Sequence, residues 1–314
     1  MDAIIFGPIL SRRFGVSLGI DVSPALKRCN FDCLYCELDP RAPVAHSDVT
    51  LSVSDIIEAL QKALVIHPHV DVITLTANGE PTLYPHFTQL AHALVAAKGT
   101  RKLLILTNSA GLIDEEIFDA LQLFDQVKCS LDAVTPAVFA KIDRPHATIT
   151  IEAIKSALVR FASLYRGELI IEILVVKGIN DTIEEMQALS DFLRPLRLHR
   201  IDIGTIDRPP AYKVEAVSNG VLEALAGCFD PALPVHIAKR HTQHAIASHY
   251  SDEEIVATLA NRVLSPQEVL ELFDSASQEA LARMVGEGVV CTQAINEQLF
   301  YLLCKNLVKK RQKA

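Results

Sequence analysis

The chain has no uninterrupted apolar run that approaches the roughly 20 residues needed for a membrane-spanning helix. Its first residues, MDAIIFGPILSRR, lack the basic start and long apolar centre of a secretory signal peptide. Positive charge is not in excess either, because 38 acidic residues against 30 basic ones leave a net charge of -8. These absences argue against a membrane protein, a secreted protein and a generally basic nucleic-acid binder, although they leave room for a local basic patch. We therefore expect a cytoplasmic protein with no membrane partner.

The cysteines are unevenly spread along the chain. The chain has seven, an odd number that fits a reducing compartment better than a disulfide framework. Three of them fall within CNFDCLYC (29–36). The other four are scattered through apolar contexts, and we expect them to be buried free thiols: Cys129, Cys228, Cys291 and Cys304.

The three clustered cysteines, Cys29, Cys33 and Cys36, follow a Cys-x3-Cys-x2-Cys spacing. Structural zinc needs four ligands, usually in two separated pairs, and the next candidate ligand here is His46. A [4Fe-4S] cluster held by three thiolates instead leaves one iron open for a substrate or cofactor atom. The alternative is that the three cysteines are incidental and bind no metal.

This spacing, with Tyr35 directly before the third cysteine, resembles that of the radical S-adenosylmethionine (SAM) superfamily. The longer run over residues 6–38 resembles more particularly the wyosine-type tRNA-modifying radical SAM enzymes and uncharacterised bacterial relatives. The resemblance implies that Cys29, Cys33 and Cys36 ligate a [4Fe-4S] cluster and that SAM chelates its open iron. It also implies that the reduced cluster cleaves SAM to a 5'-deoxyadenosyl radical, and that the backbone beside Tyr35 contacts the adenine. Wyosine-forming relatives carry further N-terminal cysteines, and none precedes Cys29 here, so the wyosine reaction itself stays open.

Apolar strands alternate with helical patterns along most of the chain. We expect strands at 17–22, 70–75, 102–107, 126–131, 168–176 and 199–205, with helices from 54 and at 86–97, 114–121, about 150–164 and 182–193. Six strands that alternate with helices imply a parallel sheet with right-handed crossovers, buried on both faces. Periodicity leaves a doubly wound sheet and a partial barrel unresolved. The superfamily resemblance favours a partial (β/α)6 TIM-like barrel, which we assign to residues 1–245.

The segment ANGEPTLY (77–84) follows the second predicted strand. A glycine lets the backbone approach a ligand, and Glu80 could accept hydrogen bonds from an ammonium group. An ordinary Asn-Gly turn with an exposed glutamate is the alternative. The segment resembles the Gly-Gly-Glu motif of the superfamily, which binds the SAM amino group, with Asn78 in place of the first glycine. The resemblance predicts SAM-binding roles for Asn78, Gly79, Glu80 and Pro81.

Further polar residues follow later strands. Asn108 ends the third, and Ser130 and Asp132 share one face at the end of the fourth, where they could bind the ribose or the SAM carboxylate or simply cap a helix. Lys177 and Asn180 follow the fifth, in a loop expected at the same rim, where they could hold the SAM carboxylate or a phosphate.

Four arginines are candidate substrate contacts. Arg12 and Arg13 flank the cysteine loop, and Arg144 lies in IDRP (142–145) at the expected rim. Arg208 lies in DRPP (207–210), which resembles a further subfamily motif. Ordinary solvated arginines are the alternative for these positions.

The sequence changes character after about residue 245. Helical runs at 252–261, 266–273 and 276–286 precede a hairpin pattern at 289–303, which suggests a winged helix-turn-helix-like α+β domain over 246–314. Residues 249–314 hold nine acidic and seven basic residues, whereas a major-groove reader is normally basic. The basic tail KNLVKKRQKA is typical of a solvated, disordered end.

Together these features predict a radical SAM Fe–S oxidoreductase or transferase, with an electron donor such as flavodoxin or ferredoxin. We expect a monomer that abstracts hydrogen from a substrate held at the barrel mouth, with an RNA base, and hence tRNA, as the first candidate. One alternative is an activase that generates a glycyl radical on a protein partner. A non-enzymatic alternative is a zinc-containing nucleic-acid-binding protein.

Overall fold

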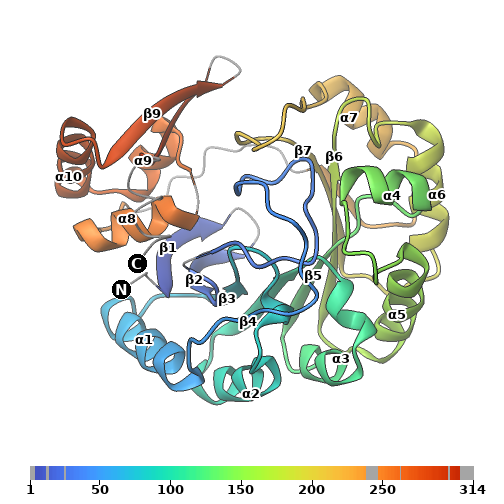
Figure 1. Cartoon of the computed structure of the whole chain (residues 1–314), viewed down its shortest axis with the longest axis horizontal. Helices are drawn as coiled ribbons and strands as arrows, with labels where there is room; N and C mark the ends of the chain where they lie inside the picture. The colour runs from blue at the N-terminus through green and yellow to red at the C-terminus, as the bar shows by residue number, and fades with distance from the viewer. Residues whose placement is uncertain are drawn as a thin grey trace.

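The computed structural model describes residues 4–11, 14–24, 26–237, 247–261, 263–295 and 298–304. Eight strands form one sheet in which every strand pairs with its neighbour in the sequence (Figure 1). Seven of them run parallel: β2 (Gly15–Asp21), β3 (Val72–Thr76), β4 (Lys102–Thr107), β5 (Gln126–Ser130), β6 (Glu168–Val175), β7 (Arg200–Thr205) and β8 (Val235–Ile237). A doubly wound sheet would reverse its strand order at a switch point. This sheet keeps the order of the sequence from β1 to β8, so the predicted partial TIM-like barrel is confirmed.

Helices cover the outer face of the sheet (Figure 1). They are α1 (Val53–Ile66), α2 (Phe87–Ala97), α3 (Glu115–Leu121), α4 (Pro136–Ile142), α5 (Ile151–Leu164), α6 (Ile183–Leu193) and α7 (Asn219–Ala226), and short 3-10 turns occupy Pro81–Leu83 and Ala110–Ile113. Side chains of Ser52, Asp114, Thr150 and Thr182 cap helix starts by accepting backbone N–H bonds. The main core lies between helices and sheet, where residues such as Leu18, Ile73 and Ile105 are completely buried.

Two parts of the strand prediction were wrong. The first strand of the sheet is not 17–22 but β1 (Ile5–Ser11), which pairs antiparallel with β2. Its register shifts between Phe6 and Ile9, around Gly7 and Pro8, and this irregularity hides the strand from periodicity. A seventh parallel strand, β8, has only three residues and therefore too little pattern to detect.

The C-terminal elements pack on the outer side of β1 (Figure 1). They are α8 (Asp252–Asn261), α9 (Pro266–Leu272), α10 (Ser275–Gly286) and the antiparallel pair β9 (Val290–Ile295) and β10 (Gln298–Leu303). Their core includes Ile9 of β1, and the Tyr250 hydroxyl donates to the Pro8 carbonyl. The winged-helix assignment stays a prediction, and the hairpin turn, the domain boundary near 245 and the basic tail lie outside the described residues.

The prediction of free thiols was wrong for Cys291 and Cys304, which form a disulfide with a Cα–Cα distance of 5.0 Å. The antiparallel register of β9 and β10 brings these two positions together, although 13 residues separate them in sequence. Cys129 is a buried free thiol as predicted, and Cys228 is free but half-buried. Among the described helices, none is long and apolar enough to cross a membrane.

Candidate active site

The cysteine loop follows the C-terminal end of β2, and a distant segment holds its backbone in place. The N–H of Leu34 donates to the Ile142 carbonyl (2.9 Å), and that of Asp32 donates to the Asp143 carbonyl (3.1 Å). The N–H of His146 donates to the Asn30 carbonyl (2.8 Å). The end of α4 and the turn after it therefore set the shape of the loop.

Asp32, between the first two cysteines, ties the loop to three other segments. Its buried carboxylate pairs with Lys27 (3.0 Å) and Arg144 (3.3 Å) and accepts a hydrogen bond from the Tyr212 hydroxyl. Burial opposes the charge, but the hydrogen bonds from Tyr212 and Lys27 outweigh it and lower the pKa of Asp32. Arg144 also lies over the Tyr212 ring, 4.7 Å from its centre. Arg144 therefore lies at the cysteine loop, and its predicted contact with a substrate stays a prediction. Sequence analysis missed the role of Asp32.

The pKa of each of the three loop thiols is raised above its usual value, and a neighbouring thiol contributes to the shift of Cys29 and of Cys33. Burial is the main cause, and it raises the pKa of Cys29 to about 12, that of Cys33 well above its usual range, and that of Cys36 to a smaller extent. A cationic metal centre reverses this effect, because coordination deprotonates a thiol. Among the described residues, no three His, Cys, Asp or Glu side chains converge on a single ion position. Three thiolates suit three irons of one cluster and leave the fourth iron open, whereas structural zinc needs a fourth ligand.

Two buried acids lie behind the loop. The Cys33 thiol donates to Asp143 (3.4 Å), and the Tyr35 hydroxyl donates to Asp132. Burial raises the pKa of Asp132 to about 6, and burial together with the nearby Asp132 holds the pKa of Asp143 well above its usual range. Asp132 also accepts from the Leu174 N–H (2.7 Å) and is 2% exposed, so it supports the tyrosine and faces no open space.

Gly79 and Glu80 occupy different environments. Gly79 has a φ of 136° and passes so close to the cysteine loop that an added Cβ would lie 1.8 Å from the Arg28 carbonyl oxygen. Only glycine permits this approach. Glu80 is 3% exposed, and its carboxylate accepts bonds from the Thr82 N–H (3.1 Å) and hydroxyl (2.7 Å), the Thr107 hydroxyl (2.7 Å) and the Asn108 N–H (2.7 Å). In this structure Glu80 therefore joins β3 to the end of β4.

Asn78 and Asn108 continue this network at the rim. Asn78 donates to the buried carboxylate of Asp21 through its side chain (2.8 Å) and its backbone N–H (3.0 Å). The Asn108 amide donates to Asn30 (2.6 Å) and lies 3.8 Å from the Cys29 sulfur. Asn108 therefore connects the end of β4 to the cysteine loop, whereas Asn78 connects the segment after β3 to the end of β2. Asp21 was missed because an acid at the end of an apolar strand has no distinctive pattern.

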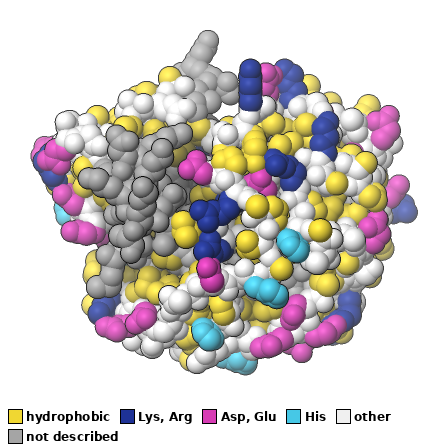
Figure 2. Space-filling view, in the orientation of Figure 1, with side chains coloured by type: hydrophobic (Ala, Val, Ile, Leu, Met, Phe, Trp, Pro, Cys, Tyr) yellow, Lys and Arg dark blue, Asp and Glu magenta, His cyan; other side chains and the backbone are white. Residues whose placement is uncertain are grey.

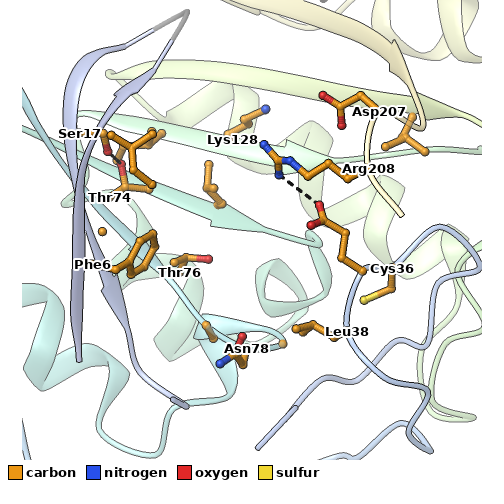
Figure 3. A pocket seen from close by; sticks show the side chains of 18 of the residues that line it. Phe6, Ser17, Cys36, Leu38, Thr74, Thr76, Asn78, Lys128, Asp207 and Arg208 are labelled. Carbon is orange, nitrogen blue, oxygen red and sulfur yellow. Dashed lines mark hydrogen bonds and ion pairs between the residues drawn. The ribbon is translucent and has the colours of Figure 1, made fainter. Parts of the chain in front are cut away.

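A cavity of about 560 Å³ opens beside the loop (Figure 3). It brings together five of the predicted site residues, namely Tyr35, Cys36, Asn78, Gly79 and Arg208. Arg208 pairs with Glu37 (3.1 Å), which directly follows the third cysteine. Residues that were not predicted also line the cavity, above all Lys128 of β5 and the aromatic Phe6 and Phe14.

Other predicted residues do not line the cavity. Lys177 is exposed and pairs with Glu215 (2.7 Å), and Asn180 is fully buried, with its amide bonded to the backbone of Val176, Leu174 and Asp132. Ser130 is half-buried, and its carbonyl accepts from the Ser109 hydroxyl. Pro81 is buried in the 3-10 turn. Arg12 and Arg13 lie outside the described residues. Figure 2 shows basic, acidic and hydrophobic side chains intermixed on the described part of one face.

Comparison with known proteins relates this chain to one superfamily. The sequence pattern that defines the radical SAM superfamily matches residues 24–193, which include the cysteine loop and the Glu80 network. A UPF0026 protein of Helicobacter pylori is 36% identical over 95% of this chain and 97% of its own length.

Two solved structures have a similar fold. SuiB of Streptococcus suis, bound to S-adenosylmethionine, superposes with a TM-score of 0.56 and 18% identity over 71% of this chain and 50% of the SuiB chain, so this chain spans about half of SuiB. A structure of TYW1 with a lysine-pyruvate adduct superposes with a TM-score of 0.50 and 16% identity over 69% of this chain and 74% of that one. At these identities the likeness is one of fold.

Proposed function

The chain belongs to the radical SAM superfamily, and from this membership we propose that it binds a [4Fe-4S] cluster through Cys29, Cys33 and Cys36 and uses S-adenosylmethionine as a radical source. Members of this superfamily are enzymes. With one electron from a donor such as flavodoxin or ferredoxin, the bound cluster supplies reductive cleavage of the SAM C–S bond, which gives methionine and a 5'-deoxyadenosyl radical that takes a hydrogen atom from the substrate.

The observation that carries the proposal is the placement of the cysteine loop. Its last cysteine, Cys36, lines the same cavity as Tyr35, Asn78 and Gly79, at the C-terminal ends of the parallel strands where barrel enzymes build their sites. The close approach of Gly79 to Arg28 packs this segment against the start of the cysteine loop, beside the proposed cluster. We assign the SAM amino group to this backbone region and the adenine to the backbone beside Tyr35.

The remaining predicted site residues are assigned roles from their individual contacts. The Asn108 amide lies 3.8 Å from the Cys29 sulfur, which supports the proposal that Asn108 orients the part of SAM nearest the cluster. Glu80, Pro81, Ser130, Asp132 and Asn180 support the rim through buried contacts, and Lys177 would have to leave Glu215 to reach a ligand. Arg144 and Arg208 are the described arginines that we propose for substrate contact.

Anaerobic purification tests the proposal. A brown protein with about four irons per chain that releases methionine from SAM under reduction would support it. A colourless protein with stoichiometric zinc and no SAM affinity would instead support the nucleic-acid-binding alternative.

The family resemblance makes an RNA base the first substrate class to test, and a glycine on a protein partner the second. Nucleosides from the tRNA of cells with and without the protein separate these classes, because only an RNA-base enzyme changes that profile. An unchanged profile would remove the RNA hypothesis.

A further inference from the structure

The segment between β7 and α7 connects two distant parts of the barrel rim. We call residues 206–217 of this segment the strap. Near its end the strap meets the loop after β6, where Ala216 pairs with Val176 and the Lys177 N–H donates to the Glu215 carbonyl (3.0 Å). Nearer its start it meets the cysteine loop, which follows β2. Because β3, β4 and β5 lie between β2 and β6 in the sheet, the strap joins loops that the sheet itself keeps apart.

Contacts with the end of the cysteine loop fasten the strap there. The Ala211 N–H donates to the carbonyl of Cys36, the last cysteine of the loop (2.8 Å). Arg208 pairs with the next residue, Glu37 (3.1 Å), and Figure 3 shows its side chain directed toward the part of the loop that holds Cys36. The backbone at the third cysteine is therefore fixed by the strap.

Tyr212 of the strap fastens the middle of the loop. Its hydroxyl donates to the buried carboxylate of Asp32, which also accepts from Lys27 (3.0 Å) and from the Arg41 N–H (3.3 Å). Arg144 pairs with the same carboxylate (3.3 Å) and lies over the Tyr212 ring, 4.7 Å from its centre. A buried carboxylate destabilises the structure around it unless donors satisfy its oxygens. Loss of the Tyr212 hydroxyl should therefore weaken the hold on the loop.

The backbone at Arg144 also points to this contact. Its φ is 47°, in the left-handed region that residues other than glycine rarely adopt. Strain of this kind persists where the surrounding structure requires it, often at functional sites. Here the strained residue is the one whose side chain reaches both Asp32 and Tyr212.

We propose that the strap holds the cysteine loop in the shape that binds a cluster, and that Tyr212 is the positioning residue through which it acts. The loop is then ordered before iron binds, and Tyr212 must leave Asp32 before the loop can open and lose a cluster. The inference rests on the proposed function, because the retained group is the [4Fe-4S] cluster of that proposal. It adds a requirement from outside the superfamily pattern, which ends at residue 193.

Hydrogen–deuterium exchange of the iron-free, full-length protein measures this hold on the loop. The N–H groups of Asp32, Leu34 and Cys36 donate to backbone carbonyls, so their exchange reports opening of the loop. Tyr212→Phe keeps the ring under Arg144 and removes only the hydroxyl. We expect these three amides to exchange about tenfold faster in this variant, because a hydrogen bond to a charged group is lost.

Tyr165→Phe is the matched control. The Tyr165 hydroxyl donates to the Phe124 carbonyl (2.8 Å), and this tyrosine lies between α5 and β6, at the opposite end of the parallel strands from the cysteine loop. This control also loses one tyrosine hydrogen bond, but loop exchange should stay within about twofold of the parent. A general loss of stability would instead accelerate exchange in both variants.

Substitutions at Arg144 separate the hold on the loop from simple turn geometry. Arg144→Gly relieves the strain at φ 47° but removes the guanidinium, whereas Arg144→Lys keeps a cation for the Tyr212 ring. We expect the loop amides to exchange about tenfold faster in the glycine variant and at a rate closer to the parent in the lysine variant. Exchange in Arg144→Gly that is equal to or slower than in the parent would overturn the proposal, since the position would then serve only the turn.

Iron retention tests the consequence for the cluster. Protein reconstituted with iron and sulfide without oxygen is mixed with an excess of bathophenanthroline disulfonate, and Tyr212→Phe should lose iron about tenfold faster than the parent and Tyr165→Phe. Equal loop exchange, or equal iron loss, in Tyr212→Phe and the parent refutes the role of the strap. A parent that takes up no iron refutes the proposed function instead, and exchange in the iron-free protein still decides whether the strap holds the loop.

Discussion

Replacement of Glu80 by glutamine separates two roles for this residue. The motif resemblance makes the carboxylate a direct ligand of the SAM amino group. The structure instead places it in the protein interior, where it accepts four hydrogen bonds from Thr82, Thr107 and Asn108. The two roles predict different outcomes for the same variant, because only a buried acceptor contributes substantially to folding.

The cost of Glu80→Gln can be worked out from the geometry. One carboxylate oxygen accepts three of the four bonds, and the other accepts only the Asn108 N–H. The least costly amide orientation therefore points its NH2 group at the Asn108 N–H, so that one charge-assisted bond is lost and two donors face each other. Loss of that bond and weakening of the other three should lower the free energy of unfolding by about 2 to 4 kcal/mol.

Urea denaturation and equilibrium dialysis with SAM, both without oxygen, measure the two effects. We expect the denaturation midpoint to fall and SAM affinity to fall with it, because Asn108 moves at the rim. Glu116→Gln, an exposed glutamate on α3, should change neither. A Glu80→Gln variant with the parent's denaturation midpoint and a tenfold to hundredfold loss of SAM affinity, about 1.4 kcal/mol per tenfold, would refute this reasoning and restore the direct contact.

Three further predictions concern other parts of the chain. Cys33→Ala leaves two loop thiols, so iron content and SAM cleavage should both collapse while the far-UV CD spectrum persists. Cys228→Ala, outside the loop, should keep the iron content and the SAM cleavage of the parent. Full iron content in the Cys33 variant would contradict the ligand assignment. Partial burial opposes the charge of Glu168, but the hydrogen bonds that it accepts from Gln126 and Lys102 outweigh burial and lower its pKa from 4.5. The contribution of Glu168 to stability is therefore present above pH 4.5 and is lost as the pH falls through the lowered pKa. Glu168→Gln should therefore be less stable than the parent at pH 7, by less than about 1 kcal/mol, and equal to it near pH 2 in thermal unfolding scans; a constant difference at both pH values would argue against the linkage. Reduction of the Cys291–Cys304 disulfide, whose partners are 13 residues apart, should destabilise the C-terminal elements by roughly 3 kcal/mol in denaturant titrations with and without dithiothreitol, and Cys291→Ala should be insensitive to the reductant.

The cysteine loop and most helices and strands were predictable because their signals are local. A Cys-x3-Cys-x2-Cys spacing lies within eight residues, and β4 has the bounds that its apolar run indicates. Glu80 was harder, because Thr107 and Asn108 lie 27 and 28 residues further on, and only the fold decides whether the carboxylate faces them or the cavity. Lys128 lies in an apolar strand, and the sequence does not show that its side chain faces the cavity, because the cavity forms only when the strands assemble into the barrel. The pairing of Cys291 with Cys304 likewise depends on the hairpin register.

The position of β1 places part of the cavity lining outside the segment that matches the superfamily pattern. Residues 24–193, which match the superfamily pattern, contain the cysteine loop and the Glu80 network. Phe6 and Ile9 line the cavity from outside that range and also pack against the C-terminal core, and Arg208 closes the rim from beyond residue 193. A fragment limited to 24–193 would keep the three loop thiols but lose Phe6, Ile9 and Arg208 from the cavity. Under the proposed function, divergence in the outer segments would change which molecule the cavity admits and leave the cysteine loop unaltered.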